Sequence, residues 1–530
     1  MFPFLLSGAL SILFCVAAEP IVSLPYGTFR GFDSGNSTRF LGVPFAQAGR
    51  FERPRTPGTL RGVQNATGFG PACPQQVLSS IPGGLADTAP VLTSEDCLTL
   101  DVYRPISTNA RSKLPVFVWI YGGAFEIGSS RDNDMAPLVE RSTLIGEPMI
   151  VVSINYRINA FGFLAGKEVD AAGVTNLGMR DQIFALEWVQ QNVAAFGGDP
   201  ARVVLGGVSA GSISVALLLL DNKKASNKLF RGAFMQSGSP LTSPSVVDGQ
   251  ADYDGLVAAT GCSHARSTLG CLKQVPFESL MAAINETANV FSFSSLNIVW
   301  RPRVDGDVLV GDPLVSVAKG QFSKVPLLSG DSDDEGTMFT LPLLNITTSA
   351  EAMSYLHSNY LPTATASQMA QIERLYPDDP AQGSPFDTGT ANQLSPQYKR
   401  LAAFQGDIMF IGPRRWFLEH ASLTQNTWSW INKRFKTASE LGSAHSSDGA
   451  IWFPSNSTTD FTAPDALINF INTLDPNVGS SRLFWPKWST TGGRSLLTFS
   501  DPNVVNITAE TFRTEAIGYL NQLLFAEASK

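Results

Sequence analysis

Histidine is scarce in this chain. Only four are present among 530 residues, namely His264, His357, His420 and His445. A mechanism that needs a histidine base therefore has few candidates. Acidic residues outnumber basic ones, with 46 Asp and Glu against 38 Lys and Arg, which gives a net charge of -8. The sequence contains no run of basic residues. This balance argues against nucleic acid or an anionic membrane as a partner.

Metal-ligand spacings, long apolar runs and linkers are missing as well. The sequence holds no Cys-x-x-Cys pair and no His cluster, so we expect no metal and no cofactor. After residue 18 no apolar run is long enough to cross a bilayer, and the C-terminus is the polar Ala-Ser-Lys, so we expect no stable membrane anchor. No repeat or low-complexity segment divides the chain, which favours a single domain over residues 19–530.

One long apolar run opens the chain. Residues 2–18 end in Val16-Ala17-Ala18, which predicts a signal peptide over residues 1–18 and a secreted, extracellular protein. The run lacks the usual Lys or Arg, so a retained N-terminal anchor is the alternative. Six sequons fit a glycosylated secreted chain: Asn36, Asn65, Asn285, Asn345, Asn456 and Asn506.

Cysteine is rare too. Loss of Cys15 with the signal peptide leaves an even number, Cys73, Cys97, Cys262 and Cys271, as expected of a disulfide-bonded secreted chain. Four cysteines allow three pairings. The local one, Cys73 with Cys97 and Cys262 with Cys271, closes two short loops and needs no long-range rearrangement.

Short apolar runs alternate with helical patterns. Alternating apolar and polar residues predict an antiparallel hairpin within residues 21–45. Strands are predicted at Leu98–Tyr103, Leu114–Tyr121, Met149–Asn155, Phe230–Gln236 and Val325–Ser329, and directly before Ser209. Helical periodicity covers Met179–Gln190 and Thr511–Ala528. This pattern indicates an α/β fold of right-handed βαβ units.

The segment around Ser209 has the pattern of a nucleophile elbow. Arg202–Leu205 is a buried-strand pattern, Gly207-Val208-Ser209-Ala210-Gly211 follows, and an Ala/Leu-rich helical run comes next. Only glycine is expected at 207 and 211, because a Cβ there would collide with the facing backbone. A Gly/Ser-rich loop without a catalytic role is the alternative.

A serine nucleophile needs a histidine base and an acid that orients it. His445 lies in a Gly/Ser-rich segment typical of a loop, whereas His357 and His420 lie in helical patterns and His264 lies between two cysteines. The acid candidates are Asp331, Asp333, Asp334 and Glu335, which follow a predicted strand. A solvated acidic loop is the alternative, and the residues alone do not choose among the four.

A Gly-rich loop follows the strand at Leu114–Tyr121. Its backbone N–H groups at Gly123 and Ala124, together with that of Ala210, are predicted to bind the oxyanion of a tetrahedral intermediate. A simple strand-ending turn is the alternative, and a phosphate-binding loop is disfavoured because no Lys-Ser/Thr follows.

Several motifs occur in one order along the chain: Ser94–Leu98, Tyr121–Phe125, Asn155–Arg157, Ala195–Pro200, Gly207–Gly211, Asp334–Gly336 and Gly442–His445. Together they resemble the type-B carboxylesterase/lipase family, and within it the fungal lipases of the Candida rugosa type. The resemblance covers essentially the whole mature chain. It implies an α/β-hydrolase fold with a large, mostly parallel sheet flanked by helices. It also implies Ser209, Glu335 and His445 as the catalytic triad, and the disulfides Cys73–Cys97 and Cys262–Cys271.

Two positions depart from the family pattern. Val208 stands where the family usually has glutamate, and Ala124 stands where the third glycine of the oxyanion loop is usual. Valine removes a buried carboxylate near the catalytic acid, whereas alanine still offers its N–H group. We expect both changes to be tolerated.

The predicted activity is hydrolysis of carboxylic esters with apolar acyl groups, through an acyl-enzyme on Ser209. The phenylalanine-containing segments Val290–Leu296 and Met338–Leu341 are candidate linings of an acyl pocket. The loop at residues 74–96 allows about two helical turns at most, which predicts weak interfacial activation. It holds no aromatic residue, which disfavours a choline ester as substrate. The alternatives are a lipase or sterol esterase with a deep acyl tunnel, an aryl (feruloyl-type) esterase, and a binding or adhesion protein on an inactive scaffold.

Overall fold

A computed structural model describes residues 19–80, 91–220, 228–455, 457–479 and 483–530. The predicted signal peptide and the sequon at Asn456 lie outside this part of the chain. No helix within the described ranges is long and apolar enough to cross a bilayer.

The fold is organised around one 11-stranded sheet, with a separate three-stranded sheet near the N-terminus. Its six central pairings, from β8 to β13, are parallel, and the pairings at both edges are antiparallel. In spatial order the large sheet contains β14 (Val504–Ala509), β13 (Ser495–Ser500), β12 (Thr427–Lys433), β11 (Leu327–Ser332), β10 (Gly232–Gln236), β9 (Gly198–Val208), β7 (Leu114–Ile120), β8 (Ile150–Ile154), β6 (Thr99–Pro105), β4 (Ser37–Pro44) and β3 (Phe32–Ser34). The small sheet contains β1 (Ile21–Leu24), β2 (Gly27–Arg30) and β5 (Val63–Asn65).

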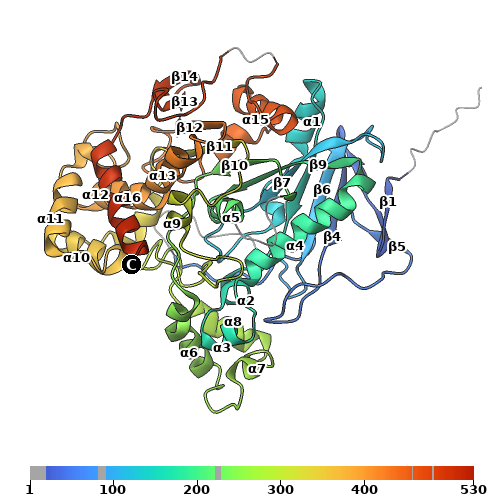
Figure 1. Cartoon of the computed structure of the whole chain (residues 1–530), viewed down its shortest axis with the longest axis horizontal. Coiled ribbons are helices and arrows are strands. Elements are labelled where there is room, and N and C mark those ends of the chain that lie inside the picture. Colours follow the sequence, from blue (N-terminus) through green and yellow to red (C-terminus); the bar gives the residue numbers. More distant parts are fainter. Residues whose placement is uncertain (1–18, 81–90, 221–227, 456, 480–482) are drawn as a thin grey trace, which may run out of the picture.

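Helices cover both faces of the large sheet (Figure 1). The α-helices are α1 (Ala136–Leu144), α2 (Asn159–Phe163), α3 (Lys167–Ala171), α4 (Leu177–Asn192), α5 (Ala210–Leu219), α6 (Gln250–Ala259), α7 (Thr268–Leu272), α8 (Phe277–Asn285), α9 (Pro313–Ala318), α10 (Ser349–Tyr360), α11 (Ala366–Leu375), α12 (Tyr398–Gly406), α13 (Gly412–Ala421), α14 (Gly449–Trp452), α15 (Thr462–Thr473) and α16 (Thr514–Ala528). Two further helical segments line the site described below, η5 (Met338–Leu343) and η7 (Asp407–Ile411).

Strand β7 illustrates why the central strands carry apolar side chains on both faces of the sheet. Successive side chains of a strand point to opposite faces of the sheet. Val116, Val118 and Ile120 enter the hydrophobic cluster that contains residues of α4 and α5. Phe117 and Trp119 enter the cluster on the other face, which contains residues of α1 and α15. A strand buried on both faces has no solvent side, so its sequence is continuously apolar.

The chain segments between the later strands build the rest of the molecule. In Figure 1, α6, α7 and α8 gather at the bottom of the view, and α10, α11, α12 and α16 gather at the left. The second group shares a hydrophobic cluster, to which Leu356, Ile372, Leu401 and Leu520 belong. These insertions sit on a single continuous sheet.

Most strands and helices predicted from the sequence are present, with two differences. The predicted N-terminal hairpin is in fact two hairpins, β1–β2 and β3–β4, and they belong to different sheets. The short strand β5 and the strands β12, β13 and β14 were not predicted. Most positions of β12 and β13 hold polar or aromatic residues, and Asn506 and Thr508 interrupt the aliphatic residues of β14, so these strands lack the continuous aliphatic run that marks β8.

Candidate active site

Ser209 lies at the turn between β9 and α5 in a strained backbone conformation, with φ 55° and ψ -125°. The turn depends on two glycines. A Cβ at Gly211 would lie 2.1 Å from the carbonyl oxygen of Ile120, and one at Gly207 would lie 2.5 Å from the backbone of Gly211. The backbone N–H of Ser209 donates to the carbonyl oxygen of Gln236, over 2.8 Å. This contact ties the turn to the neighbouring strand β10.

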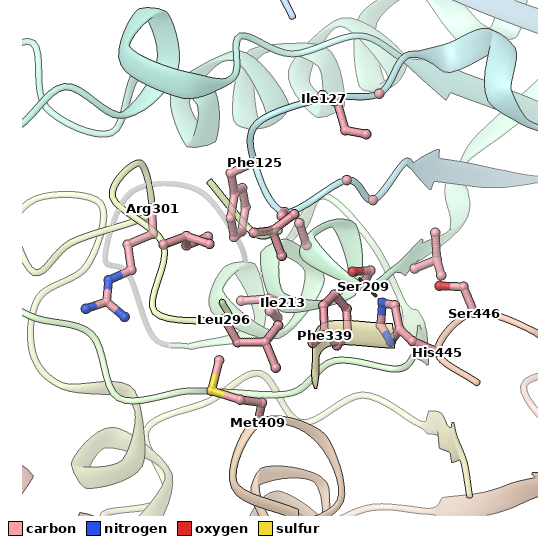
Figure 2. Close-up of a pocket in the computed structure, with 18 of the residues that line it drawn as sticks. Phe125, Ile127, Ser209, Ile213, Leu296, Arg301, Phe339, Met409, His445 and Ser446 are labelled. Atoms are coloured by element: carbon pink, nitrogen blue, oxygen red, sulfur yellow. Dashed lines mark hydrogen bonds between the residues drawn. The ribbon is translucent and has the colours of Figure 1, made fainter. Parts of the chain in front are cut away.

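Ser209, His445 and Glu335 form one hydrogen-bonded chain. The Oγ of Ser209 lies 2.8 Å from Nε2 of His445, and Nδ1 of the same ring contacts Oε2 of Glu335. Figure 2 shows the Ser209 hydroxyl facing the imidazole, with the dashed hydrogen bond between them. The three residues come from the β9–α5 turn, the loop before α14 and the loop after β11. This geometry suits a serine whose proton passes to a histidine.

The other carboxylate oxygen of Glu335, Oε1, is held by two hydrogen bonds. Oε1 accepts hydrogen bonds from Oγ of Ser237, over 2.7 Å, and from the backbone N–H of Ser332, over 2.6 Å. Glu335 is buried. Sequence analysis missed both donors, although Ser237 directly follows a predicted strand, where polar groups collect at the carboxyl edge of the sheet.

The neighbouring acidic residues have other partners. Asp331 pairs with Arg414 at 2.6 Å, and Lys436 contacts Asp333 at 2.7 Å and Asp334 at 2.6 Å. Burial outweighs the charge of Arg414 and raises the pKa of Asp331 to about 7. All three are buried, so the alternative of a solvated acidic loop is wrong. Glu335 alone of the four candidates contacts a described histidine.

The other histidines lie away from Ser209. His357 in α10 contacts the carbonyl oxygen of Ala364 at 3.1 Å, and His420 in α13 contacts that of Trp416 at 2.8 Å. His264 is exposed near the disulfide of Cys262.

The Gly-rich loop after β7 lies beside Ser209. Gly123 and Ala124 have left-handed φ values of 100° and 57°, and both line the same cavity as Ser209 and Ala210. The N–H groups of Glu126 and Ile127 donate to the carbonyl oxygen of Gly123, over 2.9 and 3.0 Å. A tight turn of this kind leaves the N–H groups of 123 and 124 outside its own hydrogen bonds.

Glu126 supports this loop from the interior. Its side chain is fully buried, and Oε2 accepts from the backbone N–H of Val290 over 2.9 Å. Its carbonyl oxygen accepts from the N–H of Gln76, over 3.0 Å. Burial raises the pKa of Glu126 to about 8, because the charged form loses its hydration. The carboxyl group therefore joins the loop to the segment at Val290, and the backbone carbonyl oxygen of Glu126 joins it to the segment at Gln76.

Asp448 is a second buried carboxyl group near the site that sequence analysis missed. It accepts from Nε2 of Gln236 over 2.7 Å and from Nε1 of Trp430 over 2.9 Å. Burial raises its pKa to about 6. Since Gln236 also holds the N–H of Ser209, Asp448 links the His445 loop to the elbow. Val208 is half-buried at the elbow itself.

A cavity of about 1010 Å³ opens at Ser209 and His445. Of the segments predicted to line it, Val290, Phe291, Leu296, Met338 and Phe339 do so, whereas Leu341 packs in the adjoining hydrophobic cluster. Further lining residues, which the sequence did not single out, come from α5, η7 and α16: Ile213, Leu217, Met409, Phe410 and Leu524. Figure 2 shows Ile213, Leu296, Phe339 and Met409 gathered beside the serine and histidine.

Both disulfides have the local pairing, Cys73–Cys97 and Cys262–Cys271. The loop at 74–96 is described only at 74–80 and 91–96, and those residues contain no helix. Its first half is tied to α8, because the N–H of Val77 donates to Oδ1 of Asn285 over 2.9 Å.

The sequons differ in their surroundings. Asn36, Asn65, Asn345 and Asn506 are exposed, whereas Asn285 is half-buried and its Oδ1 holds the loop just described. Glycosylation at the four exposed positions stays a prediction.

Comparison with known proteins gives one answer. A family model described as "Carboxylesterase family" matches residues 18–518. Lipase 5 of Diutina rugosa is 39% identical over 99% of both chains, and secreted lipase 1 of Botryotinia fuckeliana is 38% identical over 95% of this chain and 93% of that one. The crystal structure of Aspergillus niger EstA superposes with a TM-score of 0.83, at 27% identity over 96% of this chain and 99% of that chain. The predicted α/β-hydrolase fold is thereby confirmed, and the chain belongs to the carboxylesterase family of carboxylic-ester hydrolases.

Proposed function

We propose that this protein is a secreted serine hydrolase of esters with apolar acyl groups, and that Ser209, His445 and Glu335 are its catalytic triad. The observation that supports this proposal most directly is the series of hydrogen bonds from Oγ of Ser209 through the ring of His445 to Glu335. A serine hydroxyl becomes a competent nucleophile when an oriented histidine takes its proton.

In the proposed mechanism His445 removes the Ser209 proton as Oγ attacks the ester carbonyl. The N–H groups of Gly123, Ala124 and Ala210 stabilise the oxyanion, and protonated His445 then gives its proton to the leaving alcohol. Water, activated by the same histidine, releases the acid and regenerates the serine. Glu335 stays ionised throughout and holds Nδ1 of His445 as a donor.

The lining of the cavity supports an apolar acyl group. Phe339 and Phe410 flank the imidazole of His445, with ring centroids 5.0 and 4.7 Å away. Apolar residues of α5, η7 and α16 continue the wall. A cavity of this volume accommodates a long acyl chain, which favours the lipase-type alternative over a shallow aryl-ester site.

Secretion rests on the apolar segment at 1–18 and on relatives that are themselves named secreted lipases. The single-domain organisation over residues 19–530 is part of the same proposal. Interfacial activation is expected to be weak because of the short loop at 74–96.

The test is Ser209→Ala, assayed on p-nitrophenyl butyrate below its solubility limit. We expect loss of nearly all turnover, by about 10³-fold or more, with the fold unchanged by circular dichroism. Ser446→Ala is the matched control, because Ser446 also lines the cavity and lies next to His445 in the sequence. An organophosphonate should label the wild type and the control, but not Ser209→Ala. Retention of a tenth of the turnover by Ser209→Ala would exclude the proposal.

A graded acyl series from butyrate to palmitate then defines the substrate class. A maximum at long chains supports the lipase-type alternative, and a maximum at butyrate supports a short-chain carboxylesterase. A steep rise at the solubility limit would contradict weak interfacial activation.

A further inference from the structure

Glu126 lies inside the loop that carries two of the predicted oxyanion donors, and its side chain is fully buried. The neighbouring residues Phe125 and Ile127 line the cavity, whereas Glu126 does not. In Figure 2, Phe125 and Ile127 mark the path of this loop above Ser209. The carboxyl group does not reach the cavity, so it acts on the reaction through the backbone of the loop.

Hydrogen bonds tie this loop to three other segments of the chain. The carbonyl oxygen of Phe125 accepts from the N–H of Asn159 over 2.6 Å, and that of Glu126 accepts from the N–H of Gln76 over 3.0 Å. Oε2 of Glu126 accepts from the N–H of Val290 over 2.9 Å. Of these three hydrogen bonds, the one to Val290 runs through a titratable side chain, and the other two join backbone groups.

The segment at Val290 is part of the apolar wall of the cavity. Val290 and Phe291 belong to a hydrophobic cluster against which Ala124 packs, and all three line the cavity. Ala124 has a left-handed φ of 57°, which is unfavourable for a residue with a Cβ, so surrounding contacts must hold it there. The hydrogen bond between Val290 and Glu126 joins the same two segments. It therefore helps to fix the N–H group of Ala124 relative to the acyl wall.

The surroundings of the carboxyl group suit its neutral form. Oε1 of Glu126 has no contact with solvent and no hydrogen-bond partner among the described residues. Burial raises the pKa of Glu126 to about 8, and the hydrogen bond from Val290 offsets only part of this shift. The carboxyl group is therefore mainly neutral at pH 7 and ionises as the pH rises through about 8.

No charge in the described part of the chain compensates an ionised Glu126. Two segments that contact it contain no acidic or basic residue: 74–80 and 288–296. The segment that contains Asn159 contributes Arg157, but this guanidinium pairs with Asp181 at 2.7 Å. Tyr121, at the start of the loop, stays neutral because burial raises its pKa well above its ordinary value. A carboxylate at position 126 thus keeps the cost of its lost hydration.

We propose that Glu126 is a positioning residue of the oxyanion hole, whose neutral carboxyl group holds the loop against the segment at Val290 and whose ionisation releases the loop and lowers turnover. This inference rests on the proposed function of Ser209. A buried carboxylate recovers hydration when water reaches it, which requires the loop to separate from the segment at Val290. The N–H groups of Gly123 and Ala124 then leave the positions in which they stabilise the oxyanion.

The first test is the dependence of kcat on pH. Wild type is assayed on p-nitrophenyl butyrate between pH 6 and 10, with spontaneous hydrolysis subtracted. We expect kcat to fall as the pH rises through about 8, to about a tenth of its value at pH 7, because the neutral form of Glu126 is lost. Glu126→Gln keeps an acceptor for the N–H of Val290 and carries no charge, so its kcat should not fall through pH 8. Glu286→Gln, at an exposed position outside the cavity, is the matched control and should keep the wild-type fall.

The second test separates positioning from a general effect on folding. Glu126→Leu removes the acceptor and keeps a buried side chain. We expect its kcat at pH 7 to fall by about 10- to 100-fold with KM within about threefold of wild type, because a displaced oxyanion donor is missed in the transition state. A trifluoromethyl ketone, which forms a tetrahedral adduct with Ser209, should bind more weakly by the same factor. Active sites are counted with the organophosphonate, so that unfolded protein does not enter kcat.

The pH profile of Glu126→Gln remains decisive where Glu126→Leu does not fold. A wild-type kcat that is constant between pH 7 and 10, or an equal fall in Glu126→Gln, would refute the role of Glu126 and leave the proposed function intact. A folded Glu126→Leu variant with the kcat of wild type would do the same. Hydrolysis of butyrate that survives Ser209→Ala would instead refute the proposed function.

Discussion

Replacing Glu335 by glutamine tests the orienting role of the carboxylate with little change in volume. Oε1 accepts two donors, Ser237 Oγ and Ser332 N–H, while Oε2 accepts from Nδ1 of His445 alone. A glutamine has one acceptor oxygen and one NH₂ group. The backbone N–H of Ser332 cannot reverse its polarity, so the amide oxygen takes the Oε1 position and the NH₂ group faces His445.

Nδ1 of the imidazole must then accept a hydrogen bond, and the ring proton moves to Nε2. A protonated Nε2 can no longer take the proton of Ser209. Wrong-tautomer variants of catalytic triads lose about 10³- to 10⁴-fold in kcat, or about 4 to 5.5 kcal/mol of transition-state stabilisation. We expect that loss for Glu335→Gln, measured as kcat on p-nitrophenyl butyrate with circular dichroism to confirm folding. Glu335→Asp keeps an acceptor and should be more active than Glu335→Gln. A glutamine variant within tenfold of wild type would refute this reasoning.

Two further predictions concern stability. Folded Glu126 has a pKa of about 8, above its ordinary 4.5, so its contribution to stability is full below about pH 4.5 and is lost as pH rises through 8. Glu126→Gln does not titrate, so the free energy of unfolding of wild type should fall by a few kcal/mol relative to this variant between pH 5 and 8 in urea titrations. The exposed Glu286→Gln is the control, and a pH-independent gap would contradict the assignment. Gly211→Ala should lower the free energy of unfolding by several kcal/mol and abolish turnover, because its Cβ would lie 2.1 Å from the carbonyl oxygen of Ile120. The control is Gly255→Ala, at an exposed position with no atom near the added Cβ, which should be neutral or stabilising. Equal urea unfolding midpoints for the two variants would contradict the steric argument.

The elbow and the central strands were predictable because their causes are local. A strand buried on both faces must be apolar along its length, which made β7 and β8 evident. A turn in which Ile120 and Gly211 approach each other must lack Cβ atoms, which made the Gly-x-Ser-x-Gly pattern informative. The resemblance to a family added Glu335, which composition did not distinguish from its three acidic neighbours.

The sequence alone therefore determined the α/β class, the candidate nucleophile and a short list of partners. Without the family resemblance, only the tertiary structure distinguishes the acid that contacts His445, because Lys436 and Arg414, distant in sequence, engage the competing aspartates. It also decided that Ser237 and Ser332 hold Glu335, that Asp448 joins two loops, and that the carboxyl group of Glu126 contacts the backbone of Val290. Each of these contacts joins residues brought together by strand order and helix packing, and periodicity in one chain records the face a residue occupies but not the partner it meets there.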